Sequence, residues 1–404
     1  MKILYMGSAC DQERYNSMQK KDPRPYYTAQ YMFEMSLIEG FSKQNVDMNI
    51  YCIVQEPNYP NASLYFRNKE KKINDKYTVK YISFINLIFL KEAMFLIKSL
   101  FICLSWYLKN INEKEKIILT PFNYPPVSIG LWFASKICGV KRVNIFTDLS
   151  QDIMTEERQK NVSKIKRIIM PIYSKLIKKL ENSYDMYVLF TKYMNDLVNS
   201  KEKPFIVMEG IYNDMNSSIL DEKKEKSIMY AGTLSWEYGI GNVLDTYQLI
   251  KDKEIELWIF GSGDAEKEII KLAEQNSKIK FFGFKTREEV LVYQKKATLL
   301  VNFRNSNDRY TKYSFPSKTF EYMASGTPFL TTKLAGIPAE YYNFLYTVEF
   351  SKAEDLSRRI DELFEENPIE LEEFGLRARN FILTKKNNIV QSEKIISFFK
   401  RNYK

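Results

Sequence analysis

The residues best suited to chemistry lie between 314 and 326, where the sequence reads SFPSKTFEYMASG. Pro316 and Ser317 predict the start of a helix, because proline fixes φ and a hydroxyl can cap free amides; the closing glycine predicts its end. On such a helix Lys318 and Glu321 share one face. Helix N-terminal amides favour an anion, the ammonium adds a charge, and the carboxylate can accept hydrogen bonds from neighbouring hydroxyls. The pattern predicts a site for a phosphate beside a diol, as in a nucleotide sugar; a capped core helix is the alternative.

Histidine is absent from the whole sequence. Its absence excludes Ser-His-Asp and Cys-His catalysis, histidine-ligated zinc and any imidazole base. The four cysteines show no metal-ligand spacing and are interpreted as reduced structural thiols. Any chemistry therefore uses carboxylates, lysine, tyrosine, hydroxyls or the substrate itself, and we expect no metal site.

Length and charge set broad limits on the partners. The chain has 404 residues and a net charge of +10, which favours two or three domains and an anionic partner. Nucleic acid, anionic lipid and phosphorylated substrates all fit that charge, but no RNP-type or recognition-helix pattern accompanies it, so we expect no nucleic acid. The first residues form a short strand rather than the apolar core of a signal peptide, which favours a cytoplasmic location.

The first half begins like a Rossmann-type domain. A strand at 2–6 ends at Gly7, a polar loop covers 10–24, a helix covers about 27–42, and a second strand covers 45–54. No GxGxxG motif is present, so NAD binding is not favoured. Gly7 is either a plain turn or a place where substrate approaches the backbone.

Asp148 follows a predicted strand at 143–146. Ligands of open α/β sheets lie beyond the carboxyl ends of the strands, so this carboxylate is well placed to contact substrate. A turn or helix-capping carboxylate is the alternative.

Two segments favour a membrane surface. Residues 81–107 are the most hydrophobic stretch, but Lys91 and Glu92 interrupt it, so it is not predicted to span a bilayer. An interfacial helix pair and ordinary Rossmann helices both fit it. The segment 158–179 has eight basic and no acidic residues, which favours attachment to an anionic leaflet over a solvated face; nucleic acid comes after these.

The second half repeats the strand–loop–helix rhythm after a polar linker at 213–226. Strands are predicted at 227–231, before Gly232-Thr233, and at 256–260, 279–284 and 299–304. Arg304 is the final residue of the last of these segments, at the strand end from which a loop leads into the 314–326 motif. It is a candidate contact for phosphate or sugar.

The letters SFPSK and FEYMASGTPF resemble the donor-site motif of glycosyltransferase family 4, bacterial polysaccharide enzymes of the two-domain GT-B fold. The resemblance implies an α/β fold with two Rossmann-like domains that face each other across a cleft. Residues 1–212 would form the acceptor-binding domain and residues 226–385 the domain that binds the nucleotide-sugar donor. A final helix at 386–404 would cross back to the first domain.

The resemblance also assigns roles to residues. The implied donor contacts are Gly232, Thr233, Gly283, Phe284, Tyr313, Ser314, Pro316, Ser317, Lys318 and Glu321; Asp148, Lys318 and Arg304 would be catalytic, and Gly7 and Asp148 would contact the acceptor. Of the family's two acidic residues, which have seven residues between them, Glu321 matches the second and would bind the ribose hydroxyls.

The chain departs from the family pattern at four positions. Tyr313 replaces the first acidic residue, and Thr147 replaces the histidine that commonly precedes the aspartate. Thr233 and Tyr238 stand where an arginine and a lysine often contact the donor diphosphate.

The resemblance implies a retaining, metal-independent hexosyltransferase without cofactor. Its donor would be a nucleotide-diphosphate sugar, with UDP favoured, and its acceptor a lipid-linked or other glycan of surface polysaccharide, capsule or glycolipid synthesis, at the inner face of the cell membrane. The leaving phosphate can take the acceptor proton, so no imidazole base is needed. The rivals are a catalytically inactive nucleotide-sugar-binding or scaffolding subunit, and a sugar-nucleotide epimerase.

Overall fold

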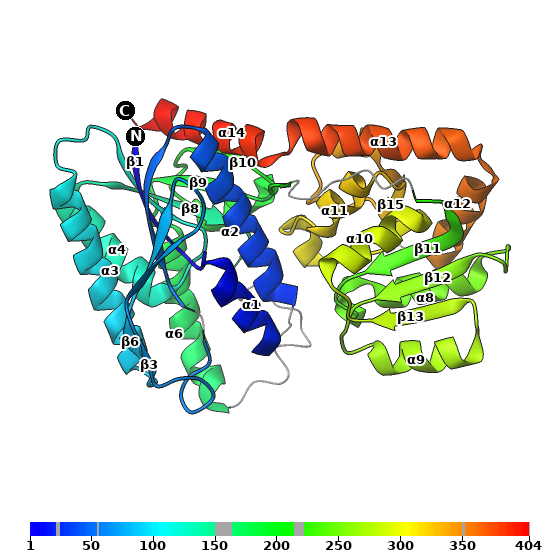
Figure 1. Cartoon of the computed structure of the whole chain (residues 1–404), viewed down its shortest axis with the longest axis horizontal. Helices are drawn as coiled ribbons and strands as arrows, with labels where there is room; N and C mark the ends of the chain where they lie inside the picture. Colours follow the sequence, from blue (N-terminus) through cyan, green and yellow to red (C-terminus); the bar gives the residue numbers. More distant parts are fainter. Residues whose placement is uncertain (22–24, 55, 150–163, 214–221, 350–351, 404) are drawn as a thin grey trace. The chain divides into compact units, whose positions relative to one another are not determined.

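The computed structural model describes residues 1–21, 25–54, 56–149, 164–213, 222–349 and 352–403. Two compact units divide the chain: unit 1 is Met1–Ile211 with Asn388–Lys404, and unit 2 is Tyr212–Asn387 (Figure 1). Each unit is an α/β domain built on a mainly parallel sheet.

Unit 1 contains an eight-stranded sheet in the order β10-β9-β8-β7-β1-β2-β5-β4, in which only β4 runs antiparallel to its neighbour. The strands are β1 (Lys2–Gly7), β2 (Asp47–Cys52), β4 (Lys69–Lys72), β5 (Thr78–Tyr81), β7 (Lys116–Thr120), β8 (Lys141–Phe146), β9 (Met186–Leu189) and β10 (Phe205–Val207), with β3 (Tyr65–Phe66) and β6 (Phe84–Ile85) forming a separate antiparallel pair. β1 and β7 are almost wholly buried, because helices cover both faces of the sheet there; this explains why both strands read as continuous apolar runs.

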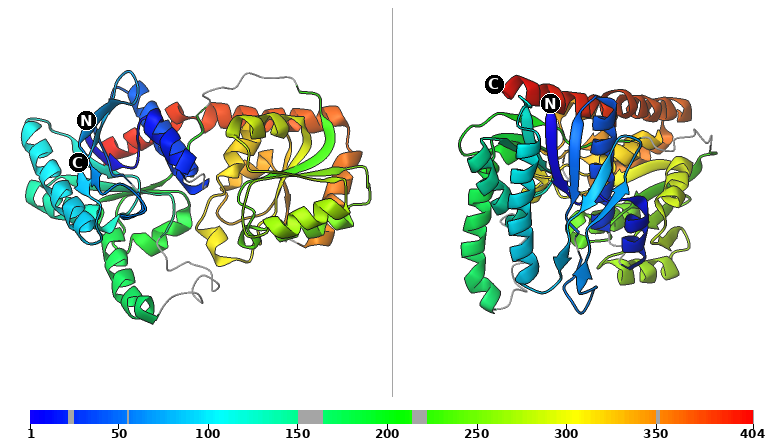
Figure 2. Two further views of the ribbon diagram at one scale, coloured as in Figure 1. Left: turned by 60° about the horizontal axis from the view of Figure 1, so that its bottom comes forward. Right: turned by 60° about the vertical axis from the view of Figure 1, so that its left-hand side comes forward.

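The helices of unit 1 are α1 (Gln12–Lys21), α2 (Pro25–Lys43), α3 (Leu90–Lys109), α4 (Pro125–Cys138), α6 (Lys164–Glu181), α7 (Asn195–Val198) and α14 (Asn388–Asn402). α3 and α4 pack together, and α14 packs against α2 (Figure 2). Gly40 of α2 permits this second contact, since a Cβ there would overlap with Ser392.

Unit 2 has a six-stranded parallel sheet in the order β13-β12-β11-β14-β15-β16. Its strands are β11 (Glu225–Ala231), β12 (Glu256–Phe260), β13 (Ile279–Gly283), β14 (Ala297–Asn302), β15 (Phe329–Thr332) and β16 (Tyr346–Val348), and its helices are α8 (Ile240–Leu249), α9 (Glu266–Gln275), α10 (Arg287–Lys296), α11 (Lys318–Ser325), α12 (Ala353–Glu365) and α13 (Pro368–Lys385). Short 3₁₀ turns cover Trp236–Tyr238, Arg309–Lys312 and Ala339–Phe344.

Alternate residues of the unit 2 strands enter two separate hydrophobic cores. Leu257 and Ile259 of β12 belong to one core, whereas Trp258 and Phe260 belong to the other. This alternation is the signature of a sheet with helices on both faces.

The structure corrects two local predictions. The polar stretch 10–24 contains helix α1 at Gln12–Lys21, although it was expected as a loop. Residues 81–107 form the end of β5, the short strand β6 and the one helix α3, not a helix pair. Lys91, which interrupts that stretch, is buried and donates to Asn58 Oδ1 at 2.5 Å, so its side chain leaves the outer face of α3 apolar.

The basic segment 158–179 lies partly outside the described residues. Helix α6 begins at Lys164 and contains Pro171 in its interior. Within the part of the chain that the structure describes, no helix is both long and apolar enough to cross a bilayer.

Candidate functional site

The candidate donor residues lie where the strands of unit 2 end at their carboxyl edge. Gly232 directly follows β11, Arg304 follows β14 by two residues, and Lys318 is the first residue of α11. Gly232 has φ 145°, in the region that favours glycine, and a Cβ there would overlap with Cε and Nζ of Lys318. The missing side chain of Gly232 therefore makes the space in which the lysine lies.

Lys318 points its ammonium at an aromatic ring. Its Nζ lies 3.6 Å from the ring centroid of Tyr230, whose hydroxyl donates to the Thr233 carbonyl at 2.9 Å. The pKa of Lys318 is lowered well below its usual value, first by loss of water around the buried ammonium and second by the charge of Arg304; Glu321 opposes the shift. Among the described residues no carboxylate lies within 4.0 Å of this ammonium, so a ligand anion would supply its missing counter-charge.

Arg304 lies beside two tyrosine rings. Its guanidinium carbon is 5.3 Å from the ring centroid of Tyr238 and 5.9 Å from that of Tyr310. Its Nε is buried and has no hydrogen-bond partner within the described part of the chain. Tyr310 is itself held, because its hydroxyl donates to the Glu237 carbonyl at 2.9 Å. Tyr238, expected as the replacement for a phosphate-binding lysine, instead flanks a cation from another loop.

Two further contacts fix the loop that carries Arg304. Asn242 donates its side-chain amide to the Phe303 carbonyl at 2.9 Å, and Thr332 donates its hydroxyl to the Arg304 carbonyl at 2.6 Å. Because residues of α8 and β15 hold the backbone of this loop, the Cα of Arg304 is fixed in place. The guanidinium is therefore positioned before a ligand binds.

Glu321 already has partners on α10. Gln294 donates to its Oε1 at 2.8 Å, and Arg287 Nε lies 3.6 Å from its Oε2. The side chain remains 32% exposed, so the carboxylate is held in place while part of it stays accessible. Gln294 and Arg287 were not found from the sequence, because nothing in the α10 sequence distinguishes them from an ordinary polar face.

Asn302 is a second residue that sequence reasoning missed. It ends β14, is 1% exposed, and neither atom of its amide has a hydrogen-bond partner among the described residues. A buried amide without partners costs free energy, and such a group at a strand end is a candidate ligand contact. No sequence signal distinguishes it from other strand residues.

The remaining donor-side predictions occupy the same edge. Gly283 ends β13 with φ 68° and accepts a hydrogen bond from the Gly261 amide at 2.8 Å, and Phe284 beside it is 52% exposed. Tyr313 follows the 3₁₀ turn at Arg309–Lys312 and is partly buried. Its ring supplies no carboxylate.

The start of α11 differs in one detail from the prediction. Ser317 is the N-cap residue, but its φ/ψ of −55°/−30° are helical and its side chain makes no capping hydrogen bond. The predicted hydroxyl cap is therefore wrong, since a helical cap residue points its side chain away from the free amides. Pro316 is buried, Ser314 is partly buried, and Gly326 ends the helix with φ 82° as predicted.

In unit 1 the candidate acceptor residues lie at one edge of the sheet. Gly7 ends β1 and Asp148 follows β8, with β7 between the two strands. Asp148 is exposed. A Cβ on Gly7 would overlap with Oε2 of Glu34. The group that approaches the backbone closely at this glycine is therefore the Glu34 carboxylate.

Glu34 was not predicted from the sequence, because a lone acidic residue in the apolar run of α2 carries no motif. It is fully buried, and burial raises its pKa. Its carboxylate accepts hydrogen bonds from the Tyr5 hydroxyl at 2.7 Å, the Ser8 and Ala9 amides at 2.9 Å each, and the Gln30 side chain at 2.6 Å. Glu34 therefore fastens the loop after β1 from the inside.

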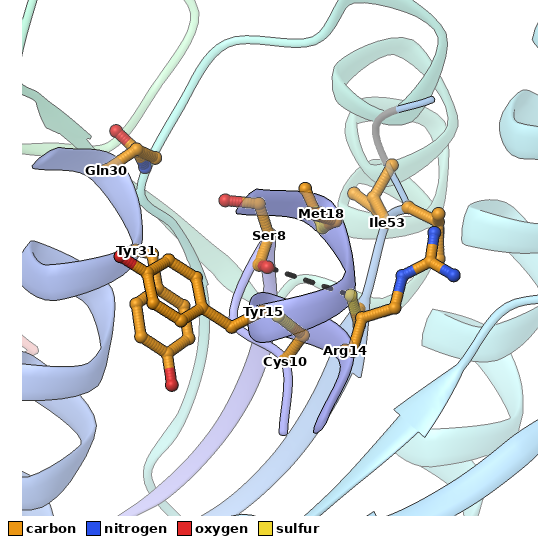
Figure 3. Close-up of a pocket in the computed structure, with 10 residues that line it drawn as sticks. Ser8, Cys10, Arg14, Tyr15, Met18, Gln30, Tyr31 and Ile53 are labelled. Carbon is orange, nitrogen blue, oxygen red and sulfur yellow. Dashed lines mark hydrogen bonds between the residues drawn. The ribbon is translucent and has the colours of Figure 1, made fainter. Parts of the chain in front are cut away.

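A small cavity lies beside that loop (Figure 3). Ser8, Arg14 and Gln30 are among its lining residues, and its volume of about 30 Å³ has room for about one water molecule. The stacked rings of Tyr15 and Tyr31, 3.7 Å apart, lie along it. A sugar does not fit this space.

Comparisons with known proteins agree with this architecture. Residues 213–381, less than half of the chain, match the family model described as glycosyl transferases group 1. No curated protein sequence matches the chain significantly.

Solved structures match nearly the whole chain. Sucrose-phosphate synthase from Thermosynechococcus elongatus is 13% identical with a TM-score of 0.62, covering 99% of both chains. The lipopolysaccharide outer core galactosyltransferase WaaB is 11% identical with a TM-score of 0.61, covering 99% of both chains. Anabaena HepE in complex with UDP and glucose is 11% identical with a TM-score of 0.58, covering 99% of this chain and 100% of HepE. At these identities the likeness shows the fold, which is GT-B with two Rossmann-like domains, as predicted.

Proposed function

We propose that this chain is a retaining, metal-independent glycosyltransferase of family 4 that moves a sugar from a UDP-sugar to a glycan or lipid-linked acceptor. The observation that carries the proposal is the pair of cations Lys318 and Arg304, held at the carboxyl edge of the unit 2 sheet without a carboxylate partner among the described residues. The match of residues 213–381 to group 1 glycosyltransferases supports it. HepE, a protein of the same fold, was solved with UDP and glucose.

Donor binding follows from the geometry of this edge. The diphosphate would lie at the start of α11, where Lys318, Arg304 and the backbone amide of Thr233 can neutralise its charge. The Gly232 amide, expected to share this role, already donates to the Phe260 carbonyl at 2.9 Å. Glu321, which Gln294 already orients, would accept hydrogen bonds from the ribose hydroxyls. The backbone at Gly283 and Phe284 would contact the base, and Ser314 and Ser317 would add hydroxyl contacts.

The chemical step balances without histidine. The bond from the anomeric carbon to the diphosphate oxygen breaks, the acceptor hydroxyl forms a new bond on the same face of the sugar, and its proton passes to the departing phosphate. The diphosphate leaves with the bonding electrons, so its growing negative charge is what the site must stabilise. Lys318 and Arg304 would do this, and Asp148 would orient the acceptor hydroxyl.

The acceptor would lie at a membrane. We propose a lipid-linked or other glycan of surface polysaccharide, capsule or glycolipid synthesis, with the protein attached peripherally to the inner face of the cell membrane. The net charge of +10 and the basic segment 158–179 support an anionic surface. WaaB, a neighbour in fold, is by name a galactosyltransferase of the lipopolysaccharide outer core.

A second candidate is a catalytically inactive subunit that binds nucleotide sugars or acts as a scaffold. The non-acidic Tyr313 favours it, as does Thr233 in place of a cation. Under this alternative Lys318 and Arg304 would still bind the diphosphate, and no sugar would be transferred.

One assay separates these functions. The purified protein is incubated with a panel of UDP-sugars and a polyprenyl-diphosphate-linked acceptor, with and without EDTA, while UDP release is measured and the product's anomeric configuration is determined by NMR. We expect UDP release only with acceptor, resistance to EDTA, and a product with the donor's configuration. UDP binding without release would establish the inactive subunit, and donor conversion without acceptor would establish an epimerase.

A further inference from the structure

An open groove lies on unit 1, between α3 and the β4–β5 edge of the sheet, with a volume of about 500 Å³. Its floor is the sheet face around Tyr51 and Lys80, which are paired neighbours on β2 and β5. Its wall is α3, through Lys98 and Phe101. Trp106 fixes α3 to β2 by donating to Asn49 Oδ1 at 2.9 Å, and β5 and β4 follow β2 towards the edge of the sheet.

Positive charge gathers in this groove. Lys69, Lys80 and Lys98 line it, against Glu70 as the one acidic lining residue. Glu70 lies 3.8 Å from Lys80, a long and exposed pair that neutralises little. Lys98 donates to the Ser83 carbonyl at 2.7 Å and to its hydroxyl at 2.5 Å, which holds this ammonium at the groove wall. The lining therefore suits a phosphate.

The outer face of α3 is an apolar stripe that no described residue covers. Leu90, Ile97, Phe101 and Leu108 are 41%, 49%, 63% and 66% exposed, at a spacing that places them along one side of the helix. Large exposed apolar patches of this kind mark interaction surfaces. Phe101 belongs to both the stripe and the groove, so the groove opens directly onto the stripe.

Further exposed apolar residues lie before α3 and on α4. Before α3, Phe89 is 82% exposed with φ 65°, a strained conformation for a residue with a side chain. On α4, which packs beside α3, Phe133 and Ile137 are 48% and 70% exposed. α4 in turn contacts α6 (Figure 2). The described last turns of α6 carry Lys175, Lys178 and Lys179.

We propose that this groove binds the phosphate head group of an anionic phospholipid, with the α3 stripe inserted at the surface of the same bilayer. Lysines flank the stripe on its groove side, as in helices that lie in the head-group layer. A free anion in solution would leave the stripe exposed to water, and an apolar protein partner would leave the lysines without a counter-charge. An anionic leaflet satisfies both.

This inference gives the proposed membrane attachment a place on the molecule, but its test uses no donor and no acceptor. A chain that fails to bind vesicles could still be a glycosyltransferase, and a chain that transfers no sugar could still bind vesicles. The intact chain is mixed with vesicles of phosphatidylcholine, with or without phosphatidylglycerol, and the bound fraction is measured by flotation. We expect binding to the anionic vesicles that exceeds binding to the neutral ones by about tenfold or more.

Two sets of substitutions test the two parts of the surface. The groove variant Lys69→Glu/Lys80→Glu and the stripe variant Ile97→Ser/Phe101→Ser/Leu108→Ser should each lower the binding constant for anionic vesicles by about tenfold or more. The targeted side chains are partly or largely exposed, and circular dichroism and the thermal midpoint check that the variants fold. The matched controls on unit 2 are Lys267→Glu/Lys271→Glu on α9 and Leu249→Ser/Ile270→Ser, which should bind like the unaltered chain.

Four outcomes overturn the proposal. They are no binding to anionic vesicles, equal binding to neutral ones, unchanged binding by the folded groove or stripe variant, or equal loss in the controls. A dimer that the stripe variant dissociates would assign the stripe to a second copy of the chain. A thermal shift with soluble glycerol phosphate as large as that with vesicles would assign the groove to a free anion.

Discussion

The carboxyl edge of each sheet holds an ionisable side chain that is withdrawn from water, but the two side chains differ in their partners. In unit 1, Glu34 is fully buried and accepts hydrogen bonds from Tyr5, Ser8, Ala9 and Gln30. In unit 2, Lys318 lies over an aromatic ring with no carboxylate within 4.0 Å among the described residues. A charge whose partners are all internal holds a loop, whereas a charge without partners is prepared for a ligand.

The largest effect is expected from Lys318→Ala. It removes charge from the departing diphosphate, so turnover should fall by a factor of about one hundred or more. The free energy of unfolding should not fall, because the substitution also removes the cost of keeping an ammonium group away from water in the folded state. UDP release measures the first quantity, and urea denaturation measures the second.

Lys333→Ala is the matched control, since this exposed lysine pairs with Glu349 at 2.7 Å and should be dispensable. Near-normal turnover of the Lys318→Ala variant would remove this lysine from catalysis. A large loss of stability would make it a structural residue like Glu34.

Glu34→Gln should act in the opposite way. The glutamine keeps the shape of the side chain, but its NH₂ group would face the backbone amides of Ser8 and Ala9, which are donors as well. We therefore expect a loss of about 2 kcal/mol in the free energy of unfolding. UDP affinity, a property of unit 2 in this proposal, should be unchanged. Urea denaturation and calorimetric titration give the two values.

Glu39→Gln is the control for this change, because Glu39 lies on the same helix and its carboxylate has only two partners among the described residues. This carboxylate pairs with Lys43 at 3.4 Å and accepts a hydrogen bond from Asn74 at 3.1 Å, which a glutamine carbonyl can also accept. The substitution should cost less than about 0.5 kcal/mol. Equal costs for the two substitutions would refute the claim that Glu34 fastens the loop after β1.

Tyr238→Leu tests how Arg304 is held. Loss of the ring removes a cation–π contact of about 1–2 kcal/mol, so kcat/KM should fall about tenfold, while Tyr238→Phe should retain activity. The decisive measurement is a double-mutant cycle: in an Arg304→Ala background, Tyr238→Leu should have no further effect. Additive losses would show that Tyr238 acts independently of Arg304.

The smallest effect concerns pH. Because the pKa of Lys318 is lowered in the free protein, a bound diphosphate should raise it and take up a proton at pH values above the free-state pKa. UDP affinity should therefore fall as pH rises from the free-state pKa towards 10.5, the ordinary lysine value. Calorimetry in buffers of different ionisation enthalpy would detect the proton uptake, which Lys318→Met should abolish; equal uptake in that variant would contradict the assignment.

The same lysine has a consequence for stability. A cation whose folded pKa is lowered is protonated more readily in the unfolded chain, so the free energy of unfolding should rise with pH between the folded pKa and 10.5. The Lys318→Met variant should lack this rise. The sign is opposite to that of a lysine that gains a carboxylate partner on folding.

Much of the fold could be predicted from local pattern. The apolar runs of β1 and β12 and the glycine after α11 follow from local rules, and these elements were predicted at nearly their observed bounds. Helix α1 was missed because QERYNSMQKK has only two large apolar residues, Tyr15 and Met18, which are too few to show a helical stripe in the sequence. The GT-B class came from the resemblance at 314–326, which covers a small part of the chain.

The site could be predicted only as a list of residues. Lys318 and Arg304 were found from their positions after a turn and a strand. Their contacts were not, because the rings of Tyr230 and Tyr238 come from β11 and from the 3₁₀ turn at Trp236–Tyr238, and spacing along the chain carries no information about these contacts. Asn302 and Glu34 were missed for the same reason: a buried polar residue looks ordinary until its surroundings are known.

Helix α14 has a consequence for synthesis. It belongs to unit 1, and Phe398 and Phe399 lie in that unit's core, although unit 2 separates them from the rest of it in the chain. On a ribosome, unit 2 is contiguous and can finish folding first, while the surface of α2 that receives α14 stays open to water until residues 388–402 emerge. The first domain to be translated is then the last to be completed, and in that interval it depends on protection from aggregation.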